Sequence, residues 1–109
     1  MLSILKNIAN LEKDPLHYVF ETIALKQKPD TLWLEFGVFV GDTIMYFSKF
    51  TNGPVFGFDS FEGLPEDWIP GWEKGKFNLR GILPPVPAHV TLIKGWFNET
   101  VPDFIKTQK

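Results

Sequence analysis

Hydrophobic residues in the N-terminal part of the chain recur at helical spacing. Apolar side chains at i, i+4 and i+7 predict a short helix over residues 1–13, with a stripe formed by Ile4, Ile8 and Leu11. A second helix is predicted to begin after Asp14, a favoured N-cap residue that is followed by proline. Its apolar stripe consists of Leu16, Val19, Phe20 and Ile23. The pattern therefore predicts an N-terminal helical segment over residues 1–30.

The apolar pattern then changes from helical to extended. Residues 31–36 are apolar except for Thr31 and Glu35, which predicts a central strand covered by helices on both faces. A glycine-bearing turn follows, and helical spacing resumes over residues 41–50. Strand, glycine turn and helix in this order open a nucleotide-binding α/β unit.

Two more strands are predicted, over residues 55–58 and 89–94. The helix over residues 41–50 lies between the first two predicted strands. The three elements form a βαβ unit, which implies parallel strands and a right-handed crossover. Residues 62–87 are rich in proline, glycine and tryptophan, and we expect them to form an ordered flap over the strand ends. Thr100 and Asp103 have capping-box spacing, which predicts the start of a last helix.

The fold class predicted from these elements is α/β. We expect a partial Rossmann-like three-layer sandwich, with three parallel strands, flanking helices and two N-terminal helices. A length of 109 residues fits one domain. Within it, residues 31–109 would form the sheet-containing part.

Composition narrows the classes of function. A net charge of −2 and the lack of a basic stripe argue against nucleic-acid binding. The chain has no cysteine, no apolar run near the ~18 residues of a membrane span, and no good signal peptide. We therefore expect a cytoplasmic protein without membrane contact. The aromatic content of 16% suits both a core and flat pockets for planar ligands.

The glycine turn distinguishes between cofactors. A dinucleotide turn needs Gly-x-Gly-x-x-Gly, so that the backbone can approach a pyrophosphate. Here Gly37 and Gly41 are four residues apart and the bulky Phe39 lies between them, which argues against a dinucleotide. The phosphate loop of ATP- and GTP-hydrolysing proteins is also absent.

S-adenosylmethionine (SAM) has no phosphate and fits this pattern better. It needs an acid near its ammonium group and another at the end of the next strand for its ribose diol, and Glu35 and Asp59 supply them. Asp59 follows the turn by about 20 residues, the spacing of a ribose-binding carboxylate in such units. Trp96 and Phe97, which follow the third strand, would stack on adenine.

Three segments give the chain a family resemblance. They are residues 34–41 (Leu-Glu-Phe-Gly-Val-Phe-Val-Gly), residues 56–66 (Phe-Gly-Phe-Asp-Ser-Phe-Glu-Gly-Leu-Pro-Glu) and residues 95–102 (Gly-Trp-Phe-Asn-Glu-Thr-Val-Pro). In this order they resemble class I SAM-dependent methyltransferases, and more narrowly the macrocin-type O-methyltransferase group. That group modifies hydroxyls on sugars and antibiotics. The resemblance covers roughly residues 31–105.

The resemblance implies a set of cofactor-binding residues. The methionine half of SAM would be bordered by Glu35, Gly37 and Gly41. Thr43 would either contact its carboxylate end or only cap the helix. The ribose would be bound by Asp59, with Ser60 and Phe61 beside it, and the adenine would be bordered by Trp96 and Phe97. SAM or S-adenosylhomocysteine (SAH), and a small hydroxylated acceptor, are the implied partners.

The chain also departs from this family. The complete enzymes have seven strands, whereas three are predicted here. In the family, Mg²⁺ ligands and the catalytic base follow the fourth strand, and no residues of this chain correspond to them. We therefore assign no catalytic residue and no metal ligand. Residues 31–109 are interpreted as the N-terminal, SAM-binding half of such a domain, inactive in methyl transfer alone.

Other interpretations stay open at this stage. Glu35 is also explained as a strand-end acid, and Trp68 and Trp72 as packing residues of the flap. Without a fourth strand, the first strand would be an exposed apolar edge, through which the chain would act as an interaction module or homo-oligomer. A nicotinamide-binding dehydrogenase domain is the second rival, and Phe39 argues against it.

Overall fold

The computed structural model describes residues 15–23 and 27–108. The helix predicted over residues 1–13 lies outside the described residues. The elements in chain order are α2 (Pro15–Ile23), β1 (Trp33–Phe36), α3 (Asp42–Phe47), the 3₁₀ turn η1 (Ser48–Phe50), β2 (Val55–Asp59), β3 (Val90–Lys94) and α4 (Phe97–Thr107). None of the described helices has the length and apolar character to cross a membrane.

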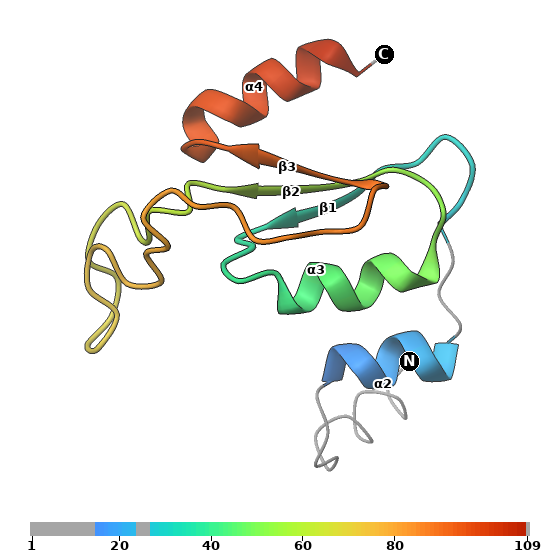
Figure 1. Cartoon of the computed structure of the whole chain (residues 1–109), viewed down its shortest axis with the longest axis horizontal. Coiled ribbons are helices and arrows are strands. Elements are labelled where there is room, and N and C mark those ends of the chain that lie inside the picture. Colours follow the sequence, from blue (N-terminus) through green and yellow to red (C-terminus); the bar gives the residue numbers. More distant parts are fainter. Residues whose placement is uncertain (1–14, 24–26, 109) are drawn as a thin grey trace.

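The described sheet has three parallel strands in the order β1-β2-β3. Helices α2 and α3 lie on one side of it and α4 lies on the other, so the chain forms three layers (Figure 1). The register pairs Glu35 with Gly57, and Asp59 with Lys94, so the carboxyl ends of the strands meet at one edge. This arrangement confirms the predicted α/β fold class.

Aromatic side chains fill the layer between the sheet and helices α2 and α3. Phe20 of α2 packs against Trp33 of β1 with ring centroids 5.7 Å apart, and against Phe47 of α3 at 6.2 Å. Ile44 and Val55 are fully buried beside them. The helical spacing read from the sequence of α2 and α3 therefore corresponds to a real core face.

Helix α4 covers the central strand on the opposite side of the sheet. The ring of Phe104 contacts Phe56 at 4.9 Å and Phe58 at 5.1 Å. Phe36 of β1 lies on the same side and is 52% exposed, and Leu34 is 38% exposed. The prediction that the first strand is central and covered on both faces is therefore wrong for the described residues, since β2 is central and α4 covers β1 only in part, through the contact of Phe97 with Phe36 at 5.6 Å.

The start of α4 also differs from the prediction. The helix begins at Phe97 rather than near Thr100, because Gly95, with φ of 145°, turns the chain directly after β3. Trp96 takes the N-cap position without a side-chain capping bond. The Thr100 hydroxyl lies inside the helix and donates to the Trp96 carbonyl at 3.2 Å. The capping-box interpretation of Thr100 is therefore wrong.

Gly57 sets how closely α3 approaches the sheet. A Cβ at this position would lie 2.7 Å from both Ile44 and Val38 and 3.0 Å from Leu92. Real Cβ contacts are longer, so a larger residue would push helix and sheet apart.

We expect Gly57→Ala to lower the free energy of unfolding by about 1–3 kcal/mol, because the methyl group overpacks the core. Chemical denaturation followed by circular dichroism measures this loss. The control is Thr91→Val, on an exposed position of β3, which should change stability little. Equal stability of the two variants would contradict the packing argument.

Candidate functional site

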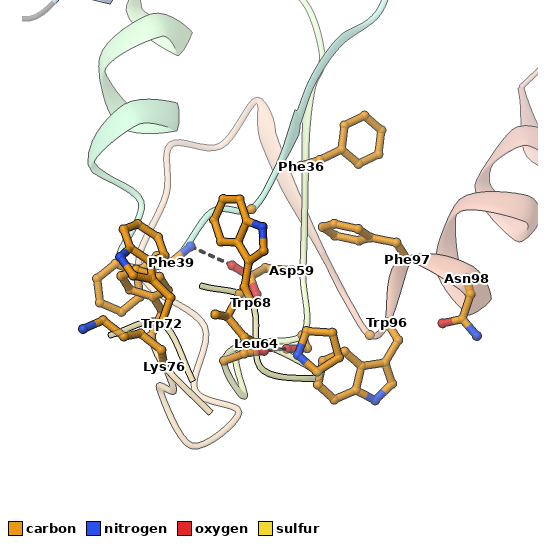
Figure 2. Close-up of a pocket in the computed structure, with 16 residues that line it drawn as sticks. Phe36, Phe39, Asp59, Leu64, Trp68, Trp72, Lys76, Trp96, Phe97 and Asn98 are labelled. Atoms are coloured by element: carbon orange, nitrogen blue, oxygen red, sulfur yellow. Dashed lines mark hydrogen bonds between the residues drawn. The ribbon is translucent and has the colours of Figure 1, made fainter. Parts of the chain in front are cut away.

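A cavity of about 770 Å³ lies at the carboxyl ends of the three strands. Its walls come from the glycine turn (residues 37–41) and the residue before it, the end of β2, the flap (residues 62–87) and the start of α4 (Figure 2). Parallel α/β sheets bind their ligands in this position. The volume is within the range of small-molecule sites.

Asp59 connects the parts of the cavity. One carboxylate oxygen, Oδ2, accepts hydrogen bonds from the backbone N–H groups of Val38 at 2.8 Å and Phe39 at 2.7 Å. The other, Oδ1, accepts one from Phe61 at 2.9 Å. The Asp59 carbonyl accepts another from Gly95 at 3.0 Å. A carboxylate has about four acceptor positions, so one remains after these three bonds to its oxygens.

The glycine turn has an unusual backbone. Phe39 has φ of 52°, in the left-handed region that bulky residues rarely adopt. Its ring packs against Phe77 of the flap, with centroids 5.2 Å apart. Gly37 also has positive φ, of 93°, and a Cβ built there meets nothing within 4 Å. The Gly37 backbone therefore faces open space in the cavity wall, where a ligand can approach closely.

Glu35 lies behind the turn and does not line the cavity. It shares a face of β1 with Trp33, on the side of α2 and α3. Burial, and to a smaller extent the nearby Asp59 charge, raise the pKa of Glu35 to about 7. Its Oε2 atom is buried and has no hydrogen-bond partner in the described part of the chain. The carboxyl would be stabilised in its charged form by a nearby cation.

The structure brings together part of the predicted site. The predicted residues that line the cavity are Gly37, Asp59, Ser60, Trp96 and Phe97. Those that do not line it are Glu35, Gly41, Thr43 and Phe61.

The predicted residues outside the cavity either pack inside the fold or lie at its surface. Phe61 is fully buried in the core. Gly41 is buried, and a Cβ there would lie 3.5 Å from Pro84, so the end of the flap packs on the turn. Thr43 is exposed in the first turn of α3. Ser60, by contrast, does line the cavity, and its hydroxyl also accepts a hydrogen bond from the Glu62 N–H at 3.1 Å.

Flap residues contribute more to the cavity than the sequence interpretation gave them. Trp68 and Trp72, for which the sequence favours packing over substrate recognition, both line the wall, with ring centroids 5.3 Å apart. Lys76, Phe77 and, from α4, Asn98 were not assigned to the site and also line it. The high density of aromatic residues in the flap indicated that it could contribute to a binding site. The sequence did not show which of these side chains face the cavity.

The chemistry that the cavity offers is mainly apolar. Its polar side chains are Asp59, Ser60, Lys76 and Asn98, and aromatic rings form much of the rest. Within residues 15–23 and 27–108, no group of three or more His, Asp or Glu side chains has the geometry to hold a metal ion. The described site is therefore suited to an organic ligand with a planar part and a few polar groups.

Comparison with known proteins shows the fold class of the described chain. No family model matches the sequence, and no curated protein is significantly similar to it. Among solved structures, the chain matches the crystal structure of the calicheamicin methyltransferase CalS11, with a TM-score of 0.56 and 17% identity. The match covers 97% of this chain and 60% of that protein. The chain thus has a partial Rossmann-like methyltransferase fold, and spans 60% of the length of the protein it matches.

The raised pKa of Glu35 predicts a pH dependence of stability. Between pH 4.5, the ordinary pKa of this side chain, and about pH 7, the folded chain holds the proton more tightly than the unfolded chain, so stability falls as pH rises through this range. We expect Glu35→Gln to remove about 1–2 kcal/mol of this fall, less than the pKa shift implies because the carboxyl is partly solvated.

Urea denaturation at pH 5 and pH 8 tests this expectation. The control is Glu66→Gln, at an exposed position of the flap, which should keep the pH dependence of the unmodified chain. If Glu35→Gln and the unmodified chain lose the same stability between the two pH values, the burial argument is wrong.

Proposed function

We propose that the chain is the SAM-binding portion of an O-methyltransferase that acts on a hydroxyl group of a small molecule, such as a sugar or another natural product. The observation that carries this proposal is the cavity where the open backbone of Gly37, the Asp59 carboxylate and the Trp96 side chain meet. The methyltransferase-like fold supports it. The sequence resemblance to the macrocin-type group supports the finer class.

The residues present fit SAM in their chemistry. The Gly37 backbone would border the methionine half, and the remaining acceptor position on Asp59 would bind a ribose hydroxyl. Trp96 and Phe97 offer aromatic surface for adenine. The unpartnered oxygen of Glu35 lies behind the turn, where the positive charge of the cofactor would favour its ionised form.

The proposed contribution of this chain is donor positioning. SAM supplies an electrophilic methyl group on its sulfonium. The glycine turn, Asp59 and the aromatic wall would hold the cofactor in one orientation at the strand ends, which favours in-line transfer by alignment. No described residue is assigned as the base that removes the acceptor proton. Residues 31–109 are thus proposed as the N-terminal half of a methyltransferase domain, with weak SAM affinity and no transfer activity alone.

A titration of the isotope-labelled chain with SAM and SAH, followed by NMR, tests cofactor binding. We expect weak but saturable shifts at residues of the glycine turn and the end of β2. Gly37→Ala should weaken binding by roughly tenfold. The added methyl group would enter the space proposed for the methionine half of the cofactor.

Gly75→Ala is the matched control. Gly75 also has positive φ, of 84°, and open space around a built Cβ, but it does not line the cavity. Both variants should therefore carry a similar strain of about 1 kcal/mol, and only Gly37→Ala should affect binding. Absence of SAM and SAH shifts in the unmodified chain, or tighter binding of a nicotinamide dinucleotide, would overturn the proposal.

The exposed edge of β1 favours a second candidate function, an interaction module. Leu34 and Phe36 lie on the side of the sheet that α4 covers only in part, and both stay exposed. Among the described residues, β1 also pairs with one strand only. Parallel sheets are normally covered on both faces. An unpaired apolar edge of this kind favours pairing with another chain.

Light scattering over a range of concentrations tests this second candidate. We expect the unmodified chain to associate, and Leu34→Lys to shift it towards the monomer by placing a charge on the exposed edge. Ile82→Lys, at an exposed flap position outside the sheet, is the control. A chain that stays monomeric at high concentration would contradict the interaction function and leave SAM binding unaffected.

A further inference from the structure

The flap contains a short hairpin that holds two tryptophans in fixed positions. Residues 69–72 form a tight turn in which the Trp72 N–H donates to the Ile69 carbonyl at 2.7 Å. The Trp68 N–H donates to the Trp72 carbonyl at 2.9 Å, which closes the hairpin. Proline followed by Gly71, with φ of 85°, is the sequence that a type II turn requires. The local turn therefore brings the backbones of the two tryptophans side by side.

A chain of aromatic contacts supports these rings from behind. Trp68 meets Trp72 edge-on, with centroids 5.3 Å apart. Trp72 meets Phe77 at 5.1 Å, and Phe77 meets Phe39 at 5.2 Å. The four rings run from the hairpin to the glycine turn, and each pair has the edge-to-face geometry that aromatic pairs prefer. The tryptophans are thus connected, through Phe77, to the glycine turn rather than to the core.

The tryptophans nevertheless leave much of their surface in contact with the cavity and solvent. Trp68 is 66% exposed and Trp72 is 36% exposed, and both line the cavity. Figure 2 shows Trp72 and Lys76 on the side of the cavity opposite Phe36 and Phe97. The cavity therefore has an aromatic wall on each side, and the flap wall presents its rings to the space between them.

The flap wall has few polar groups for a polyhydroxylated ligand. Among its lining side chains, Lys76 is the one that carries a charge, and the others are apolar: Leu64, Pro65, Trp68, Trp72 and Phe77. Hydroxyl groups placed against such a wall would lose hydrogen bonds to water without replacement. A planar aromatic ring gains from the same wall, because its flat face stacks on indole while its polar groups lie at the ring edge and need not touch the wall.

We propose that Trp68 and Trp72 form a stacking site for a planar aromatic ring on the flap side of the cavity. The ring is either that of a phenolic methyl acceptor or the adenine of the cofactor, which would then lie against the flap instead of against Trp96 and Phe97, since both rings offer the same flat π surface. This proposal rests on the proposed function in one respect, which is that it assigns the ring to the cavity proposed for SAM.

The experiment titrates the full chain with three separate probes and follows the indole N–H resonances by NMR. The probes are adenosine, catechol and methyl β-glucoside. We expect adenosine or catechol to shift the resonances of Trp68 and Trp72, and Trp68→Leu and Trp72→Leu to weaken that probe roughly fivefold each. Methyl β-glucoside should bind more weakly than the aromatic probe at every concentration.

The matched control is Ile82→Ala. Ile82 is a flap residue that is 69% exposed and does not line the cavity, so its truncation should leave all three titrations unchanged. Circular dichroism of the leucine variants should match that of the unmodified chain, because neither tryptophan belongs to the buried core.

The outcomes distinguish the sources of the ring. Loss of adenosine affinity in the leucine variants assigns the site to adenine, and loss of catechol affinity assigns it to the acceptor. The stacking site is overturned if both aromatic probes bind the leucine variants as tightly as the unmodified chain, or if methyl β-glucoside binds equally well. Catechol binding that depends on the tryptophans, in a chain that binds neither SAM nor SAH, supports the stacking site while the proposed function fails.

Discussion

The Asp59 carboxylate is the interaction on which the strand-end architecture depends. Three backbone N–H groups donate to it, from Val38, Phe39 and Phe61, and the carbonyl of the same residue accepts from Gly95. Hydrogen bonds to a charged acceptor contribute roughly 1.5–3 kcal/mol each. One residue thereby fixes the segments that follow all three strands. Any ligand that uses Asp59 meets a group that is already positioned by the fold, with little orientational freedom left to lose.

The same charge shapes the electrostatics around the glycine turn. Asp59 contributes, after burial, to the raised pKa of Glu35, so two carboxyl groups share one end of the sheet. Lys76, from the flap, is the cationic side chain that lines the cavity. The charged side chains that line the cavity are therefore one carboxylate and one ammonium group, and Glu35 behind the turn adds a carboxyl that a nearby positive charge would ionise.

Local periodicity was sufficient to predict β1, α3, β2 and β3, because the alternation between helical and extended patterns is written in consecutive residues. The predicted start of α4 was wrong. Gly95 turns the chain directly after β3, so the helix begins at Phe97, before the position that the Thr100 capping pattern indicated. Whether β1 is central or at an edge depends on which strands lie beside it, which an apolar run cannot encode. The inward position of Trp68 depends on contacts with Trp72 and, through it, Phe77, so only the tertiary structure assigns it to the cavity.

The contact between Phe39 and Phe77 has a thermodynamic consequence. It joins a residue of the glycine turn, held in the left-handed region, to the aromatic chain that supports the flap. A ligand that orders one of these segments also orders the other, so part of the conformational entropy is lost only once. A ligand at the glycine turn and a ligand at the flap would therefore bind with positive cooperativity. By linkage, each would raise the affinity of the other by the same factor.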